Sequence, residues 1–210
     1  MGEVLAVSQQ RPSAEAVARG AQVLRTEGVL VLPTDSVYGL ACAATPQNPA
    51  HRRIFQIKKR DFSQTLPLFV ADVADLMVYA TGVPKWAQEL ARRFWPGALT
   101  LVVKASDKIP AEYRAPSGTV ALRCPDSVLA RELTREVGPL AQTSANSHGA
   151  PAATSGAMLE QGIVDAADLV LDGGQTPCGT ASTIVDCTSR EPKILREGAL
   201  SAGEVFSSLE

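Results

Sequence analysis

Residues 29–40 read Val29-Leu30-Val31-Leu32-Pro33-Thr34-Asp35-Ser36-Val37-Tyr38-Gly39-Leu40, an apolar run that leads directly into a polar turn. Gly28 and Pro33 bound the apolar run, which is typical of a buried strand, and proline stops the hydrogen-bond ladder. Hydroxyl groups and one carboxylate follow at positions where no core requires them. We interpret the end of this strand as the edge of a site; an ordinary strand-to-loop exit is the alternative.

The composition is that of an ordinary globular protein: of 210 residues, 45% are hydrophobic and 20% charged, and the formal net charge is -2. We therefore predict a single domain over residues 1–210. No apolar run approaches the roughly 18 residues of a membrane span, and the N-terminus lacks a signal-peptide pattern, so a soluble cytoplasmic protein is expected. Because the net charge does not attract nucleic acid, phosphate binding must depend on a local group of Lys and Arg.

The cysteine pattern argues against a metal or disulfide protein. Cys42, Cys124, Cys178 and Cys187 form no CxxC pair, and the two histidines add no zinc-like spacing. We expect four reduced thiols, mostly buried as packing residues, and no protein metal site.

Helix and strand patterns alternate without a long linker or an internal repeat, which favours one α/β domain. Helices are predicted at about 13–27, 50–59, 72–79, 84–94, 127–137 and 155–160. Strands are predicted at about 29–33, 66–70, 99–103, 119–123, 140–143, 169–171, 182–186 and 194–196. This balance predicts an open, twisted, mixed sheet with flanking helices.

Familiar catalytic signatures are missing from the chain. It has no GxxxxGK[ST] phosphate loop, no GxGxxG after a strand, no HExxH and no GxSxG elbow. Basic residues instead follow the ends of predicted elements, namely Lys58, Lys59, Arg60, Arg123 and Arg196. Each alone is more often a solvated surface charge, but together they can clamp a triphosphate.

Two clusters rich in hydroxyl and amide groups lie at the edges of predicted strands, at 142–149 and 179–186. Small side chains there expose backbone N–H groups, and Ser and Asn side chains can hydrogen-bond a nucleotide or its phosphates. A turn with a helix cap at Ser144–Asn146 and a simple strand entry at Ser182 are the alternatives.

Seven short motifs occur in one order along the chain. They are P-T-[DE]-[ST]-x-Y-G-L at Pro33–Leu40, K-x-R at Lys58–Arg60, P-G-x-x-T at Pro96–Thr100, a strand ending at Arg123, S-A-N at Ser144–Asn146, S-T-[IV]-[IV]-D at Ser182–Asp186 and [LI]-R-x-G at Leu195–Gly198. In this order they resemble the YrdC-like family of L-threonylcarbamoyladenylate synthases, over a core of about 14–198. The resemblance implies a YrdC/RibB-like single α/β domain with its site on the concave face of the sheet.

The resemblance also implies a reaction. A nucleotidyltransferase of this family condenses L-threonine, bicarbonate and ATP into threonylcarbamoyl-AMP and pyrophosphate. Separate downstream transfer proteins then carry the threonylcarbamoyl group to tRNA, so tRNA binding by this chain itself is expected to be weak or indirect. Mg²⁺ is expected on the phosphates of ATP rather than in a protein cage.

Site roles follow from the matching positions. The resemblance gives Lys58 and Arg60 a catalytic role on phosphates and carbamate oxygens, and it gives substrate contacts to Thr34, Tyr38 and Ser182. The nucleotide-binding set is Lys58, Arg60, Arg123, Thr143, Ser144, Asn146, Ser182 and Arg196. Asp35 is a candidate general base, with a turn-capping role as the equal alternative.

Three positions depart from the family pattern. Asp61, Gln64 and Phe69 stand where the family often has Pro, Lys or Asn, and His. Asp61 adds negative charge beside the expected clamp, and Phe69 cannot give the hydrogen bond of a histidine. Two other functions stay open: an RNA-binding YrdC-like paralogue, and nucleotide-dependent carbamoyl transfer to another acceptor. The additional C-terminal domain of longer relatives is expected to be absent.

Overall fold

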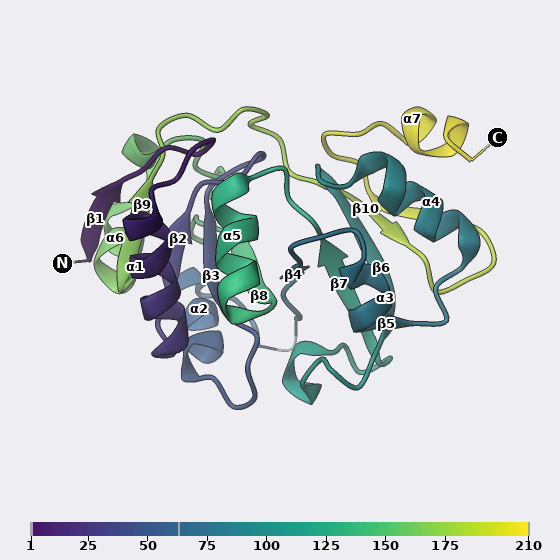
Figure 1. Cartoon of the computed structure of the whole chain (residues 1–210), viewed down its shortest axis with the longest axis horizontal. Coiled ribbons are helices and arrows are strands. Elements are labelled where there is room, and N and C mark those ends of the chain that lie inside the picture. Colours follow the sequence, from purple (N-terminus) through teal and green to yellow (C-terminus); the bar gives the residue numbers. More distant parts are fainter. Residues whose placement is uncertain (1, 63, 210) are drawn as a thin grey trace.

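The strands of this chain form one sheet that extends across the whole molecule (Figure 1). The computed structural model describes residues 2–62 and 64–209. Its strands are β1 (Glu3–Ala6), β2 (Leu30–Leu32), β3 (Gly39–Ala43), β4 (Leu68–Phe69), β5 (Ala80–Thr81), β6 (Leu99–Ala105), β7 (Thr119–Arg123), β8 (Leu140–Ser144), β9 (Leu169–Asp172), β10 (Thr183–Asp186) and β11 (Lys193–Arg196). The order in the 11-stranded sheet is β1-β9-β2-β3-β8-β4-β7-β6-β10-β11, and β5 pairs with β6.

The sheet is mixed, as predicted. Parallel pairs join β1 to β9, β9 to β2, β4 to β7 and β6 to β10, whereas β2–β3, β3–β8, β4–β8, β6–β7 and β10–β11 are antiparallel. Strands from distant parts of the chain are therefore neighbours. In particular, the parallel pair of β6 and β10 brings residues near 100 beside residues near 184.

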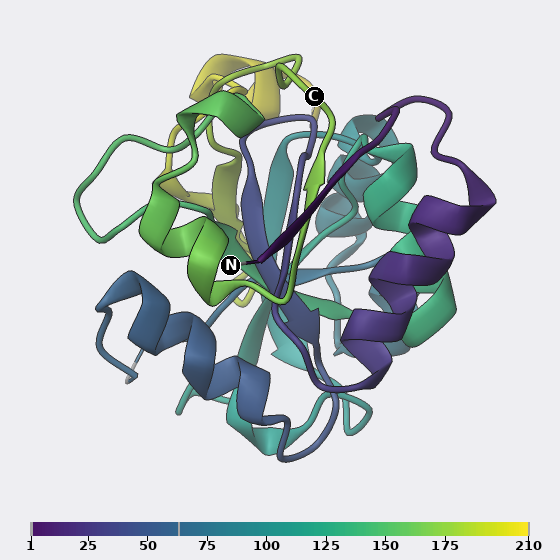
Figure 2. The same cartoon turned by 90° about the vertical axis from the view of Figure 1, so that its left-hand side faces the viewer.

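Helices cover the sheet from both sides. They are α1 (Ala14–Arg25), α2 (Pro49–Lys58), α3 (Asp75–Tyr79), α4 (Lys85–Phe94), α5 (Val128–Val137), α6 (Gln161–Ala166) and α7 (Ala202–Ser207), with 3₁₀ turns at Ala111–Tyr113 and Gly156–Met158. Figure 2 shows α1 and α5 on one side of the strands, and α2 and α6 on the other. Helix α4 packs on β6.

Local chemistry explains where the first elements begin and end. The Ser13 hydroxyl accepts a hydrogen bond from the backbone N–H of Ala16 and caps α1, as its sequence pattern predicts. Strand β2 follows inside the predicted range 29–33. Val31 packs in one core cluster while Leu30 and Leu32 pack in the other, so β2 is buried on both faces.

The sequence prediction missed several elements. Strand β3 falls in the predicted turn after 29–33, and β1, β5, α6 and α7 lie outside every predicted element. The segment Gly39–Ala43 is short and has no β-branched residue, yet it is completely buried between β2 and β8. Its strand conformation therefore depends on tertiary pairing rather than on intrinsic preference.

The cysteines agree with the sequence prediction. All four are free thiols; Cys42, Cys124 and Cys187 are buried, and Cys178 is exposed. Within the described residues, no helix has both the length and the apolar character that a membrane crossing requires.

Candidate active site

Residues from the sheet, from the turn after β2 and from the segment after α2 enclose a cavity of about 360 Å³. Its lining residues are Thr34, Ser36, Val37, Arg60, Thr65, Pro67, Phe69, Thr100, Val102, Ala121, Arg123, Gln142, Thr143, Ser144, Ala181, Ser182, Ile184, Leu195 and Arg196. This volume lies in the ordinary range of small-molecule sites.

Strand alternation explains which side chains reach the cavity. Along β6, Leu99 and Leu101 are buried in the core, while Thr100 between them faces the cavity. Along β7, Leu122 is in the core and Arg123 faces the cavity. At β6 and β7, one face of the sheet therefore carries the site, and the opposite face packs in the core.

The turn after β2 is held by its own side chains. The Thr34 hydroxyl donates to the carbonyl of Val37 at 2.8 Å and accepts from the backbone N–H of Ser36 at 3.1 Å. Thr34 is almost fully buried, at 1% exposure, so its hydroxyl shapes the turn from inside. The result is a rigid loop that presents Asp35 and Ser36 toward β7.

Arg123 is the central fixed charge of the cavity. One of its terminal nitrogens, Nη2, lies 2.6 Å from the Asp35 carboxylate and 2.5 Å from the Ser36 hydroxyl. Its Nε donates to the carbonyl of Gly97 at 3.0 Å. The second terminal nitrogen, Nη1, has no hydrogen bond to any described residue, so two N–H groups remain for a ligand.

The end of α2 separates two neighbouring cations. Lys59 adopts a left-handed backbone conformation with φ of 51°, which ends the helix and turns the chain toward the sheet. Arg60 beyond it lines the cavity, half-buried, with its Nε donating to Gln64 at 2.6 Å. Lys58, on the helix itself, is buried on the inner side.

Lys58 holds the loop that follows β8. Its Nζ donates to the backbone carbonyls of Ser144 at 2.6 Å and Asn146 at 2.7 Å, and to the Asn146 side-chain oxygen at 2.9 Å. The Ser144 hydroxyl in turn contacts Asn146 at 2.6 Å. The K-x-R and S-A-N motifs are therefore one physical unit, in which the lysine fixes the loop and Ser144 faces the cavity.

The other end of the cavity is formed by β10 and β11. Arg196 donates to the carbonyl of Ser182 at 2.7 Å and approaches the Ser182 hydroxyl at 3.4 Å. A Cβ on Gly198 would lie 2.2 Å from the carbonyl oxygen of Ala181, so this position requires glycine. The close approach explains the glycine of the [LI]-R-x-G motif.

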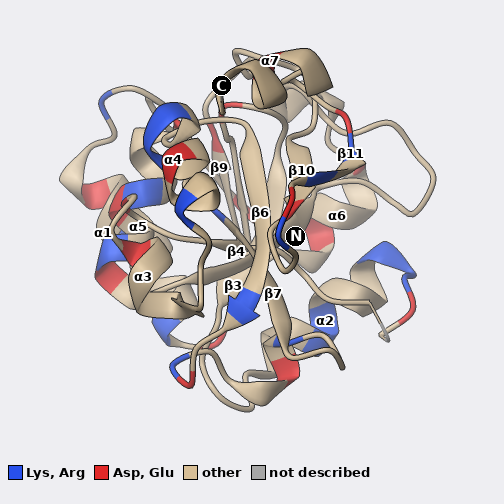
Figure 3. Cartoon of the chain, turned by 90° about the vertical axis from the view of Figure 1, so that its right-hand side faces the viewer, with Lys and Arg blue, Asp and Glu red and all other residues tan. Residues whose placement is uncertain are grey.

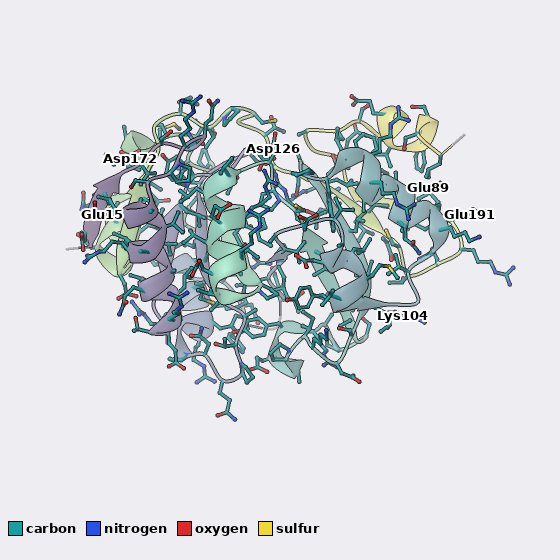
Figure 4. All side chains as sticks on the ribbon, viewed as in Figure 1. Glu15, Glu89, Lys104, Asp126, Asp172 and Glu191 are labelled. Carbon is teal, nitrogen blue, oxygen red and sulfur yellow. The ribbon has the colours of Figure 1, made fainter. Side chains whose placement is uncertain are left out.

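Most predicted site residues meet in this cavity. Its lining includes Thr34, Arg60, Arg123, Thr143, Ser144, Ser182 and Arg196, while Lys58 and Asn146 lie directly behind Ser144. Tyr38 lies apart: its buried hydroxyl is 2.8 Å from the carbonyl of Gly174 and 3.0 Å from the Asp172 carboxylate. Asp172 in Figure 4 marks that left-hand region of the molecule.

Four polar lining residues had no assigned role from the sequence, namely Ser36, Thr65, Thr100 and Gln142. Ser36 belongs to the motif at Pro33–Leu40 and Thr100 to the motif at Pro96–Thr100, so both could have been assigned to the site from the sequence. Gln142 begins the hydroxyl- and amide-rich cluster at 142–149, whereas Thr65 belongs to no quoted motif and faces the cavity because of the way the chain folds before β4.

The cavity gathers positive charge. Burial lowers the pKa of Arg60, and burial together with the nearby Arg123 lowers the pKa of Arg196. Arg123 and Arg196 thus repel each other, and with Arg60 in the same lining the cavity favours an anionic ligand. Acidic and basic residues are otherwise interspersed along the helices (Figure 3). Among the described residues, no cluster of three His, Cys, Asp or Glu side chains is arranged to hold a metal.

Removing the Lys58 charge is expected to change how stability depends on pH. Burial, and then the charge of Arg60, lower the pKa of Lys58 from 10.5 to about 8, with Glu160 acting in the opposite direction. Between these pH values the unfolded chain binds the proton and the folded chain does not. The free energy of unfolding should therefore rise with pH relative to a Lys58→Met variant, by up to about 3 kcal/mol.

Chemical denaturation of both proteins between pH 7 and 10 measures this difference. Lys104→Met, which removes an exposed lysine from β6, is the control. If the free energies of unfolding of the unchanged protein and of Lys58→Met differed by the same amount at every pH in that range, the lowered pKa of Lys58 would be contradicted.

A second hollow, of about 510 Å³, lies between α4 and the turn after β10 and contains none of the predicted site residues. Lys104, on its rim, is in the opposite half of the molecule from Asp172 (Figure 4). Volume alone therefore does not identify the site; the convergence of charge and hydroxyl groups does.

Comparison with known proteins agrees with this geometry. Residues 22–198 match the model of the Sua5/YciO/YrdC family, which is described as "Telomere recombination". A threonylcarbamoyl-AMP synthase of Pyrococcus abyssi is 38% identical over 181 residues, which cover 85% of this chain and 53% of that protein. This chain thus spans about half the length of that curated relative.

Solved structures show the same fold. P. abyssi Sua5 complexed with L-threonine superimposes with a TM-score of 0.88 at 33% identity, covering 98% of this chain and 60% of the other. E. coli YciO superimposes with a TM-score of 0.84 at 25% identity, covering 98% of this chain and all of the other. From the family match and these relatives, the chain belongs to the Sua5/YciO/YrdC family.

Proposed function

We propose that this chain is an L-threonylcarbamoyladenylate synthase, a nucleotidyltransferase that condenses L-threonine, bicarbonate and ATP and releases pyrophosphate. One observation carries the proposal: three guanidinium groups, from Arg60, Arg123 and Arg196, converge with a row of hydroxyl groups in one cavity. Membership of the family and the P. abyssi relatives, one named as this synthase and one solved with L-threonine, support the choice of reaction.

The reaction needs a carbamate and an activated phosphate side by side. The threonine amine first combines with bicarbonate, with loss of water, to give a carbamate. A carbamate oxygen then attacks the α-phosphorus of ATP, the bond to the β-phosphate oxygen breaks, and pyrophosphate leaves. The site must therefore orient two anions and balance negative charge as it moves to the leaving group.

The geometry suits these tasks. Arg60, Arg123 and Arg196 would neutralise the phosphates and the carbamate, because guanidinium groups match such oxygens in pairs. Ser144 and Thr143 would contact the nucleotide, and Ser182 would contact the threonine or the carbamate. Lys58 would keep the Ser144–Asn146 loop in place through its hydrogen bonds to the two carbonyl groups.

Three other proposed roles follow from position. Thr34 would form the cavity wall through its turn, and Tyr38 would anchor that turn from behind. Asp35 would hold Arg123 rather than act as a base, because its carboxylate is already paired with that guanidinium. Mg²⁺ would enter with ATP and be held by the phosphates, where it supplies further positive charge.

Pyrophosphate release with ATP, bicarbonate and each amino acid in turn tests the proposal. We expect release to require both bicarbonate and threonine. Salt-sensitive RNA binding without any ATP turnover would favour the RNA-binding alternative, and turnover with another acceptor would favour carbamoyl transfer elsewhere. We place the protein in the cytoplasm, with weak direct tRNA binding and handover of the product to separate transfer proteins.

Replacing Phe69 by histidine is expected to lower the KM for threonine about two- to tenfold. Phe69 lines the cavity opposite Arg123 in the β4–β7 pairing, with its ring 5.7 Å from the guanidinium carbon. A histidine there would add one hydrogen bond, which is worth about 0.5–1.5 kcal/mol.

Steady-state kinetics with threonine and valine measure this effect. Phe206→His, on α7 outside the cavity, is the control for a Phe-to-His change. If the unchanged protein turned over valine faster than threonine, the apolar wall at Phe69 would have changed the substrate and the synthase proposal would fail.

A further inference from the structure

The P-G-x-x-T motif at 96–100 lies beside two groups of the cavity and has no role in the function proposed above. It leads from α4 into β6. The carbonyl of Gly97 accepts the Nε hydrogen of Arg123 at 3.0 Å. Three residues later, the Thr100 hydroxyl lies 2.8 Å from the Ser182 hydroxyl. One short segment therefore contacts both the central guanidinium and a hydroxyl of the cavity.

The contact between Thr100 and Ser182 is buried and specific. Thr100 is only 1% exposed and Ser182 only 7%. The parallel register of β6 and β10 pairs Thr100 with Ile184, so Ser182, just before β10, is a diagonal neighbour of Thr100 although 82 positions separate them in the chain. Among the described residues, the Thr100 hydroxyl has Ser182 as its one hydrogen-bond partner. Thr100 thus lies between the core residues Leu99 and Leu101, and its hydroxyl bonds one neighbour, Ser182.

Either hydroxyl of this pair can be the donor, but Thr100 has no other acceptor among the described residues, which favours Thr100 as the donor. Arg196 approaches the Ser182 hydroxyl oxygen at 3.4 Å and can only donate. The oxygen has two lone pairs, so it can also accept the hydrogen of Thr100. If Thr100 is the donor, Thr100 and Arg196 occupy both lone pairs of Ser182, and the Ser182 hydrogen is free to donate to an anionic ligand in the cavity.

We propose that Thr100 is a positioning residue that orients the Ser182 hydroxyl as a hydrogen-bond donor to the threonine carboxylate or carbamate. This inference rests on the proposed synthase function. Thr100 lines the cavity, but its hydroxyl is bonded to Ser182, so it would act through Ser182. The P-G-x-x-T motif then has a physical reason: its glycine carbonyl holds Arg123, and its threonine hydroxyl directs Ser182.

The test is a set of variants that separates orientation from packing. Thr100→Val keeps the shape and removes the hydroxyl, and we expect it to raise the KM for threonine about tenfold with little change in the KM for ATP. Thr100→Ser keeps the hydroxyl and should restore the KM for threonine. In a Ser182→Ala background, Thr100→Val should add almost no further loss, because the group it orients is gone.

Thr134→Val is the matched control. Thr134 is also buried, in α5, and its hydroxyl bonds the carbonyl of Ala130 at 2.8 Å, away from the cavity. It should lose some thermal stability and keep the KM for threonine. Equal KM values for Thr100→Val and the unchanged protein, or an undiminished effect of Thr100→Val in the Ser182→Ala background, would overturn the inference.

The proposed function is tested separately, by pyrophosphate release from the unchanged protein. If that protein released no threonine-dependent pyrophosphate, the synthase proposal would fail before any variant was compared. The inference about Thr100 would then fail together with the proposed function. If the unchanged protein were fully active and Thr100→Val had the same KM for threonine, only the inference about Thr100 would be overturned.

Discussion

Arg60→Ala is expected to reduce threonine-dependent pyrophosphate release by about two to three orders of magnitude while the protein stays folded. The side chain lines the cavity, and removing one charged contact from such a site commonly costs about 3–4 kcal/mol of transition-state stabilisation. Its hydrogen bond to Gln64 lies at the surface, so the free energy of unfolding should change by less than about 1 kcal/mol. Steady-state turnover and thermal unfolding measure the two quantities.

Arg93→Ala is the matched control for this experiment. The Arg93 guanidinium carbon lies 5.9 Å from the ring centre of Phe94, much as that of Arg60 lies 6.0 Å from the ring of Phe55, but Arg93 is on α4 outside the cavity. Turnover should be unchanged in Arg93→Ala. Full turnover in Arg60→Ala would remove this residue from the proposed clamp, and an equal loss of stability and activity would make it a structural residue.

The sheet could be predicted where apolar runs are long or end in clear signals. Strands β2, β6 and β7 were found because each is an apolar run bounded by Gly, Pro or a charged residue. Strand β3 was missed because Gly39–Ala43 has weak strand preference of its own. Its neighbours β2 and β8 impose the conformation, and no local pattern reports such neighbours.

The burial of Lys58 follows from helical spacing along α2. Ile54 is buried on α2, and Lys58 follows it by one helical turn, so both lie on the inner face. The left-handed Lys59 ends α2, so Arg60 lies beyond the helix. A lysine on the core side of a helix needs oxygen acceptors, and the Ser144–Asn146 loop supplies them. Helical spacing thus indicated burial, although only the fold shows which loop is held.

Tyr38 carries a similar signal. It is two positions from Leu40, and both side chains are in the same core cluster, as strand alternation requires. What sequence could not predict is the meeting of β6 with β10 and of β4 with β7, because these pairs join distant segments. The distances between Thr100 and Ser182, and between Asp35 and Arg123, depend on that long-range strand order.

Replacing Arg123 by methionine is expected to lower the free energy of unfolding by about 3–5 kcal/mol, because it leaves the Asp35 carboxylate buried without its partner. The two side chains are only 6% and 11% exposed, and 2.6 Å separates Nη2 from the carboxylate oxygen. Adding Asp35→Asn to Arg123→Met should recover part of the stability but none of the turnover, since the cavity still lacks that charge. Denaturant unfolding measures the first effect, and pyrophosphate release the second.

Arg135→Met breaks an exposed pair with Glu132 at 2.7 Å and should cost less than about 1 kcal/mol. If Arg123→Met were no more destabilising than Arg135→Met, the buried pair would not be what holds the turn after β2 against β7, and the fixed orientation of Arg123 in the cavity would need another cause.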